Sequence, residues 1–547
     1  IVDRLVGSEM CIRDSTSTFG TITSAVEGAH LNLGEAMTPI TLNYTVNANA
    51  SSGSSGSSSS SSSVYVNNKV SAGNSFTCAI LDNGDLKCWG HDYYGQLGDG
   101  GTTHTSSTQT TAPSSTAIDL GTGRTAVAVS GHTHTCAILD NGDLKCWGRD
   151  NYGQLGNGGH NTNLNAPSST AIDLGTGRTA VAVSTGHSHT CAILDNGDLK
   201  CWGRDLHGQL GDGGTNTDTN APSSTAIDLG TGRTAVAVST GNSHTCAILD
   251  NGDLKCWGSD GYGHLGDGGT NTDTNAPSST AIDLGTGRTA VAVSAGGVHT
   301  CAILDNGDLK CWGYDYRGQL GNGGTNTNLN APSSTAIDLG TGRTAVAVSA
   351  AESHTCAILD NGDLKCWGSD DYGMLGDGGY DTSLGAPSST AINLGTGQTA
   401  VAVSAGYSHT CAILDNSDMK CWGRDLNGQL GNGGLITANQ ASPVLVSGSN
   451  TWDSSTTASS GSGGGSSGSM TNVTNAMSCV ATPSLPAGLN IDSSTCTISG
   501  TPTAEAVNAT YEINATISGI TFLASIWLSA STSTFGTITS AVEGAHL

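Results

Sequence analysis

The chain has 547 residues, of which 79 are Gly and only 4 are Phe, and 12% are charged. This composition favours short strands joined by turns over helices, which draw on Glu, Lys, Leu and Ala. The formal charge of −26 repels phosphate backbones and anionic lipid surfaces, so neither nucleic acid nor a membrane is expected as a partner.

Three segments precede the repeats of this chain. Residues 1–14 resemble translated adaptor sequence and are expected to be an artefact, so they are left out of the fold prediction. Residues 15–46 contain the strand-like run GEAMTPITL at 34–42 and are expected to supply the first strands of a sandwich. Residues 47–63 are rich in Ser and Gly, which is typical of a flexible linker.

Seven copies of the pattern CAILDNGDLKCWG, with small changes, occupy residues 64–447. Their first Cys residues lie 58 positions apart once and 55 apart five times, and a fixed period of this length predicts a solenoid or a propeller. Each copy contains four strand-like runs, for example RTAVAVS at 178–184, HTCAIL at 189–194, DLKCWG at 198–203 and STAIDL at 224–229. The repeats therefore predict an all-β fold, a seven-bladed β-propeller with four antiparallel strands in each blade.

The repeat string SxxHTCAILDNGDLKCWGxDxxGQLGxGG resembles the repeat of the regulator-of-chromosome-condensation propellers. The resemblance implies the propeller fold but leaves the function open, because members of that family share a scaffold and differ in their loops. They include a nucleotide exchange factor for a small nuclear GTPase, chromatin-associated proteins and a secreted bacterial β-lactamase inhibitor. The cysteine pairs and the acidic charge depart from the nuclear members and indicate a bacterial, cysteine-paired variety in an oxidising compartment.

The segments after the repeats point to a second domain. Residues 448–470 form another Ser/Gly-rich linker, and residues 471–530 contain LPAGL followed by TISGTPT, which resembles the immunoglobulin-like modules of bacterial surface proteins. Such modules begin with a strand like the run at 34–42, so we expect a propeller inserted into an immunoglobulin-like β-sandwich, with two partial modules as the alternative. Residues 531–547 repeat 15–31 and are expected to begin a further unit of a tandem array, with an assembly overlap as the alternative.

The cysteines are expected to form disulfides within each module. Seven pairs lie ten positions apart, two more Cys lie in the sandwich, and Cys11 is left over. If the turn at 82–84 is a three-residue hairpin loop with Gly84 in the left-handed region, Cys78 lies directly opposite Cys88, within disulfide range. Reduced buried thiols and a zinc site are the alternatives, and the spacing does not suit zinc. The expected disulfide cysteines are Cys78, Cys88, Cys136, Cys146, Cys191, Cys201, Cys246, Cys256, Cys301, Cys311, Cys356, Cys366, Cys411, Cys421, Cys479 and Cys496.

The copies differ mainly in the link between the first two strand-like runs and in the loop after the third. In an up-and-down blade both segments lie at one end, called here the variable face. The nearly constant DNGD turn and DLGTGR link lie at the opposite end, called here the turn face. Variation on one face is expected if that face recognises a ligand, with relaxed drift of exposed loops as the alternative. The residues expected to bind are Tyr93, Tyr94, Arg149, Tyr152, Tyr262, Tyr316, Arg317 and Tyr372.

Other chemistry receives less support from the sequence. A His precedes the first Cys in six copies and Phe76 replaces it in one, so structural hydrogen bonding is favoured over a metal-binding ring. Acidic loops such as 211–220 lack the spacing of a calcium-binding loop, so no cofactor and no metal are expected, with loop calcium as the alternative. No nucleophile elbow, Walker loop or HExxH motif occurs, and no apolar run reaches the ~18–20 residues of a membrane helix.

The sequence therefore predicts a secreted or cell-surface recognition or adhesion protein that is not an enzyme and binds protein or glycan through the variable face. A structural spacer in a surface array is the first alternative. An enzyme with its site in the central channel is the second alternative. A unique cluster of acid, base or metal-ligating residues would favour it, and none is evident in the repeats.

Overall fold

A computed structural model of the chain describes the propeller nearly completely and the second domain as separate strands. The described ranges are 69–101, 109–269, 271–434, 438–448 and 451–452, together with the strands at 30–33, 37–40, 477–482, 489–491, 498–500, 506–517 and 520–530.

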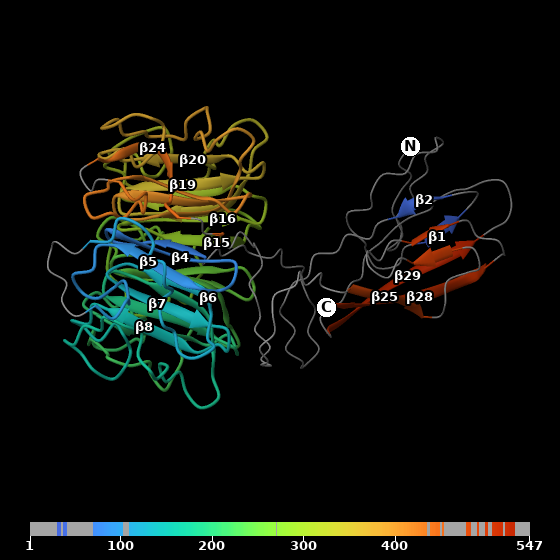
Figure 1. Cartoon of the computed structure of the whole chain (residues 1–547), viewed down its shortest axis with the longest axis horizontal. Coiled ribbons are helices and arrows are strands. Elements are labelled where there is room, and N and C mark those ends of the chain that lie inside the picture. The colour runs from blue at the N-terminus through green and yellow to red at the C-terminus, as the bar shows by residue number, and fades with distance from the viewer. Residues whose placement is uncertain are drawn as a thin grey trace. The chain divides into compact units, whose positions relative to one another are not determined.

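Seven sheets of nearly identical build form the propeller; six have three consecutive antiparallel strands, and the last has four. Figure 1 shows blade 1, in blue, beside blade 7, in orange. Blades 1 to 3 contain β3 (Val70–Ala72), β4 (Phe76–Ile80), β5 (Leu86–Gly90), β6 (Ala126–Gly131), β7 (His134–Leu139), β8 (Leu144–Gly148), β9 (Ala180–Thr185), β10 (His189–Leu194) and β11 (Leu199–Gly203). Blades 4 to 7 contain β12 (Ala235–Thr240), β13 (His244–Leu249), β14 (Leu254–Gly258), β15 (Ala290–Ala295), β16 (His299–Leu304), β17 (Leu309–Gly313), β18 (Ala345–Ala350), β19 (His354–Leu359), β20 (Leu364–Gly368), β21 (Ala400–Ala405), β22 (His409–Leu414), β23 (Met419–Gly423) and β24 (Gln440–Leu445). The seven-bladed all-β fold is confirmed.

The fourth strand expected in every blade forms as a regular strand only in blade 7, as β24. In blade 2 the corresponding segment meets the third strand at two separate places: Gly148 and Leu164 form an isolated bridge, and the Ile172 amide donates to the Leu144 carbonyl at 2.9 Å. Local side-chain bonds satisfy its backbone instead, because Ser168 accepts the Thr170 amide and Asp173 accepts the Gly175 amide. Such side-chain turns compete with strand pairing, and this competition explains the difference from the prediction.

The hydrophobic core lies between blades rather than inside each one. The cluster formed by blades 3 and 4 joins Cys191, Leu199 and Cys201 to Trp257, which is completely buried. The indole Nε1 of Trp257 donates to the carbonyl oxygen of Gln209 at 3.1 Å, and the same bond recurs in the other six blades. Each Trp therefore attaches its blade to the preceding one, as the packing interpretation of these residues predicts.

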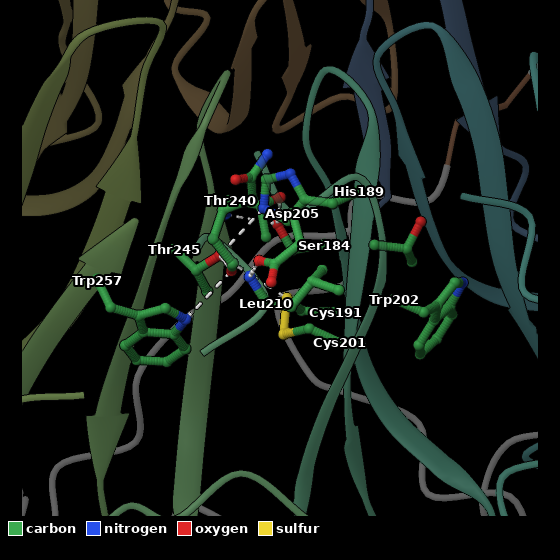
Figure 2. Close-up of a disulfide and its surroundings, with 12 residues drawn as sticks. Ser184, His189, Cys191, Cys201, Trp202, Asp205, Leu210, Thr240, Thr245 and Trp257 are labelled. Carbon is green, nitrogen blue, oxygen red and sulfur yellow. Dashed lines mark hydrogen bonds between the residues drawn. A yellow bond between two sulfur atoms is a disulfide. The ribbon is translucent and has the colours of Figure 1, made fainter. Parts of the chain in front are cut away.

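Two belts of hydrogen bonds run from blade to blade around the ring. In the inner belt a Ser hydroxyl on each first strand accepts a backbone amide of the next blade, as Ser184 does from Thr240 at 3.0 Å, and the seven bonds close the ring. In the second belt His189 contacts the Thr245 hydroxyl at 3.0 Å, and five other His–Thr pairs repeat this contact (Figure 2). The predicted structural role of these His residues is thus visible in their contacts.

The protonation state of the second belt follows from its geometry. Thr245 donates its single hydroxyl proton to the Gln209 carbonyl at 2.9 Å, so the hydroxyl can only accept from His189, whose Nε2 must carry the proton. Burial, together with the charge of His187, lowers the pKa of His189 to about 3. The imidazoles of this belt are therefore neutral at physiological pH.

Seven disulfides link the second and third strands of the blades, in the register predicted from the turn. Cys78 pairs with Cys88, and their Cα atoms are 4.1 Å apart. Gly84 has φ 82° and the Leu81 amide donates to the Asp85 carbonyl, which is the three-residue loop that the prediction assumed. Figure 2 shows the equivalent bridge between Cys191 and Cys201. The expected pair Cys479 and Cys496, like Cys11, cannot be assessed, since Cys496 and Cys11 lie outside the described residues.

The chain beyond blade 7 closes the junction between the last blade and the first. The Trp452 ring is buried and lies 5.5 Å from the Trp89 ring of blade 1. Its amide donates to the Ser417 carbonyl of blade 7. This contact falls inside the segment 448–470 expected to be a linker, so the propeller extends at least to Trp452.

The second unit of the chain combines strands from both ends of the sequence. One sheet has the order β1 (His30–Leu33), β29 (Ile520–Ala530), β28 (Ala506–Ile517) and β25 (Met477–Thr482). The other has the order β2 (Met37–Ile40), β27 (Ile498–Gly500) and β26 (Leu489–Ile491). The two compact units of the chain are residues 1–59 with 464–547, and residues 60–463. The detailed boundaries given above stay predictions.

Candidate functional site

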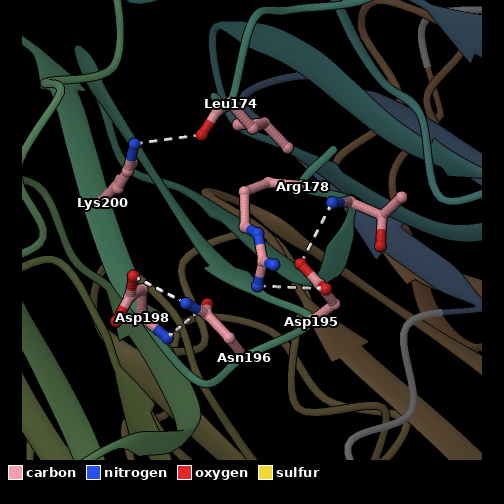
Figure 3. A network of polar contacts seen from close by, with 7 residues as sticks. Leu174, Arg178, Asp195, Asn196, Asp198 and Lys200 are labelled. Carbon is pink, nitrogen blue, oxygen red and sulfur yellow. Dashed lines mark hydrogen bonds and ion pairs between the residues drawn. The ribbon is translucent and has the colours of Figure 1, made fainter. Parts of the chain in front are cut away.

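The two variable segments of each blade lie side by side, as the up-and-down path requires. The Arg204 amide, after the third strand of blade 3, donates to the Ser188 carbonyl, in the link between its first two strands, at 2.9 Å. On the turn face Arg178, in the link to blade 3, forms an ion pair at 3.2 Å with Asp195 in the turn of blade 3 (Figure 3). The structure therefore places the sequence variation on one face and the constant turns on the other.

The backbone of the variable face is held by two side chains that recur in most copies. In blade 3 Asp205 accepts the Leu210 amide at 2.8 Å, and Gln209 accepts the amide of the variable residue His207 at 2.9 Å. Burial is the main cause that raises the pKa of Asp205, to about 6. Because these bonds go to the backbone, the loop keeps its shape whichever side chain the variable position carries.

Aromatic and guanidinium groups cover this face, and many of them contact across blade boundaries. The Arg149 guanidinium of blade 2 lies 5.1 Å from the Tyr94 ring centre of blade 1. In the same way, the Arg204 guanidinium lies 4.8 Å from the ring centre of Tyr152, and that of Arg424 lies 5.0 Å from the ring centre of Tyr372. Stacking of this kind orders the long Arg side chain.

The remaining predicted residues occupy the same face in other settings. Tyr262 packs against Tyr314, which stacks on Tyr316, with ring centres 4.5 and 6.1 Å apart. Arg317 lies over Tyr316 and forms an ion pair with Asp371 at 3.1 Å. The most exposed large apolar side chains of this set are Tyr93, Tyr316 and Tyr262, at 58%, 57% and 43% exposure. The predicted residues thus spread over blades 1, 2, 4, 5 and 6, and the predicted ligand-binding role itself stays a prediction.

A second group of residues, called here the axial cluster, was not predicted from the sequence. It consists of His132, His187, Asn242, Glu352 and Tyr407, which occupy equivalent positions in the first link of five blades. Asn242 of blade 4 donates to Glu352 of blade 6 at 2.8 Å, so these links converge at the centre of the ring. The rings of His132 and His187 lie 5.1 Å apart.

The axial cluster has unusual electrostatics for so acidic a protein. Burial raises the pKa of Glu352, while burial and the neighbouring His187 lower the pKa of His132 to about 3. Glu352 is the only Glu between residues 64 and 447, and this singularity is the sequence signal that would have drawn attention to the cluster. Which links meet at the axis depends on ring closure, so the grouping itself needed the structure.

Within the described residues, no group of three or more His, Cys, Asp or Glu side chains is arranged to hold a metal ion. In the same part of the chain, no helix is long and apolar enough to cross a membrane.

Comparisons with known proteins connect this architecture to two families. Residues 126–468 match the RCC1-like domain, and residues 68–96 match the regulator of chromosome condensation (RCC1) repeat. Residues 435–539 match a family described as "Putative Ig domain". Both resemblances noted in the sequence are therefore confirmed.

The chain is 32% identical over 378 residues to the ultraviolet-B receptor UVR8 of Arabidopsis thaliana, covering 68% of this chain and 80% of that protein. It is 26% identical over 360 residues to the E3 ubiquitin-protein ligase HERC2 of Homo sapiens, but the match spans 7% of HERC2.

Among solved structures, Prp20p from Saccharomyces cerevisiae, studied with its binding to Gsp1p and histones, has a TM-score of 0.58 at 18% identity, covering 68% of this chain and 88% of that one. Human WBSCR16 has a TM-score of 0.55 at 20% identity, covering 66% and 93%. These likenesses show the propeller fold.

Proposed function

We propose, since the chain belongs to the RCC1-like domain family, that its propeller is a recognition module that binds a protein partner through the variable face. One observation carries the proposal. Recurring buried side chains such as Asp205 and Gln209 fix the loop backbone, while the partly exposed residue between them, His207 in blade 3, differs from blade to blade. A rigid backbone that presents different side chains is typical of a binding surface.

The similar proteins support protein binding as the class of activity. Prp20p is described with binding properties toward Gsp1p and histones, and a yeast RCC1 structure contains bound Kap60. The Tyr and Arg content of the variable face suits a contact surface of the same kind. We propose binding rather than catalysis for this chain as well.

We further propose that the protein acts in an oxidising environment, secreted or at a cell surface. The seven disulfides support this location, since such bonds persist outside the reducing cytosol. Adhesion to protein or to glycan at that surface is the specific activity proposed. The immunoglobulin-like domain is in keeping with it by analogy with surface proteins.

The test is an array of extracellular proteins and glycans probed with the full chain and two matched variants. The first variant changes Tyr94, Tyr152, Tyr262 and Tyr372 to Ala. The second changes the turn-face residues Arg124, Arg178, Arg233 and Arg288 to Ala. Thermal melting first confirms that both variants fold.

We expect binding of any captured partner to be lost in the Tyr variant and kept in the Arg variant. The reverse result would show that the turn face is the binding face. Capture of glycans alone would assign the surface to glycan recognition instead of protein recognition.

A further inference from the structure

One position on the variable face divides the ring into a basic half and an uncharged half. It directly follows the Gly that ends the third strand of each blade. From blade 1 to blade 7 its residues are His91, Arg149, Arg204, Ser259, Tyr314, Ser369 and Arg424. Burial lowers the pKa of His91, so this residue is neutral at physiological pH. The three Arg residues, called here the basic arc, therefore lie on blades 7, 2 and 3, on either side of blade 1.

The basic arc differs from every other arginine in the described propeller. The remaining six each form an ion pair with an Asp: Arg124, Arg178, Arg233, Arg288, Arg317 and Arg343. Among the described residues, no carboxylate pairs with Arg149, Arg204 or Arg424, and each lies instead over a Tyr ring. In a chain with a formal charge of −26, three guanidinium groups on one face that have no carboxylate partner within the described part of the chain need an explanation.

The arc also has unused hydrogen-bonding capacity. The Nε atoms of Arg149 and Arg424 are buried and have no hydrogen-bond partner among the described residues. Because Nε is buried, a ligand would bind the outer edge formed by the two terminal nitrogens, and a carboxylate fits that edge with two parallel bonds.

The arc lies beside the axial cluster, because the Arg204 amide donates to the carbonyl of Ser188, next to His187, and the Arg424 amide donates to that of Ser408, next to Tyr407, both at 2.9 Å. After burial, the charges of Arg149 and Arg204 are the causes that lower the pKa of His187. Glu352, followed by burial and Tyr372, raises the pKa of Tyr407, and the charge of Arg424 opposes this rise. The cations therefore act on groups at the centre of the ring as well as on the rim.

From these observations, and resting on the proposed function, we infer that the basic arc binds an acidic peptide segment of the protein partner. The three cations sit on three separate blades, so the matching ligand presents several carboxylates in a row rather than one small anion. The exposed Tyr93 and Tyr262 on the same face suit the apolar side chains of such a segment.

The experiment is a fluorescence-anisotropy titration of the full chain with a labelled Glu-rich peptide, at low ionic strength and at about 0.15 M salt. The test variant is Arg149→Gln with Arg204→Gln and Arg424→Gln. The matched control is Arg178→Gln with Arg233→Gln and Arg288→Gln, which removes the same charge from the turn face. Melting curves establish that both variants fold.

We expect the test variant to bind the peptide at least about tenfold more weakly and the control to stay within about twofold of the unchanged chain. Equal losses in both variants, or no loss in either, would overturn the inference. So would a sulfated oligosaccharide that binds through the arc when the peptide does not. A partner from the array that needs the four Tyr residues but not the arc would sink this inference and leave the proposed function standing.

Discussion

The two faces of the propeller are built from the same seven copies, yet they are stabilised in different ways. On the turn face, partly exposed side chains bond to one another, as Arg178 and Asp195 do at 37% and 36% exposure, and Asp195 also accepts the Thr179 amide. On the variable face, buried side chains such as Asp205 and Gln209 bond to the loop backbone. The exposed Arg–Asp pair of the turn face depends on the identity of both side chains, whereas the variable positions can change while Asp205 and Gln209 still hold the loop backbone.

Acidification should reveal the largest difference between the two faces, because buried titratable groups stabilise the variable face. The lowered pKa of the belt His residues means that their stabilising contribution is present above about pH 6.5 and is lost as the pH falls toward 3. The raised pKa of the loop Asp residues acts in the opposite direction, since their contribution is present below pH 3.8 and is lost as the pH rises through about 6. The two trends oppose each other between pH 6 and 4.

We therefore expect the melting temperature to change little from pH 6 to 4 and to fall steeply below pH 4, measured by circular dichroism. The variant Asp260→Asn should lose stability earlier on acidification, because one opposing group is gone. The matched change Asp253→Asn, in the constant turn of the same blade, is the control for the loss of one carboxylate away from the variable face. A steady decline beginning at pH 6.5 in the unchanged chain would show that the Asp residues do not take up protons in the folded state.

Removing one disulfide should weaken both faces together, since the bridge lies midway along a hairpin that reaches from one face to the other. We expect Cys246→Ala with Cys256→Ala to lower the free energy of unfolding by about 2–3 kcal/mol, on the chain-entropy account of a short closed loop. Urea denaturation without reductant measures the change. A loss confined to the exchange rates of amides on one face would show that the faces are not coupled through the hairpin.

Blade 7 offers a smaller test, within the turn face, at the one turn that lacks Gly. Ser417 has φ 64°, a region that disfavours side chains, so Ser417→Gly should raise the free energy of unfolding by about 1 kcal/mol. The matched change Gly362→Ser should be clearly destabilising, because a Cβ there would lie 2.6 Å from the Thr399 Cβ of the next blade. A destabilising effect of Ser417→Gly would mean that the Ser side chain contributes more than its backbone strain.

The success of prediction from the sequence depended on how local each feature is. The bridge between Cys78 and Cys88 could be predicted because turn length alone sets the register of a hairpin. The fourth strand was wrong in six blades because side chains such as Ser168 satisfy the backbone in a way that a strand pattern does not reveal. The contact between Asn242 and Glu352 was missed because it joins blades 4 and 6 and exists only once the ring has closed.

The smallest effect is expected at the place where the turn face itself departs from its repeat. Gln398 replaces the Arg of the other links, and Asp415 keeps its bond to the Thr399 amide at 3.2 Å. Gln398→Arg should form with Asp415 the ion pair that Arg343 forms with Asp360. It should nevertheless raise the free energy of unfolding by less than about 0.5 kcal/mol, because exposed pairs are screened by water and salt. Urea denaturation at low and high salt checks this, with the reverse change Arg343→Gln as the control. If the free energy of unfolding rose by more than about 1 kcal/mol and the gain disappeared in high salt, exposed ion pairs would be a main source of stability on the turn face.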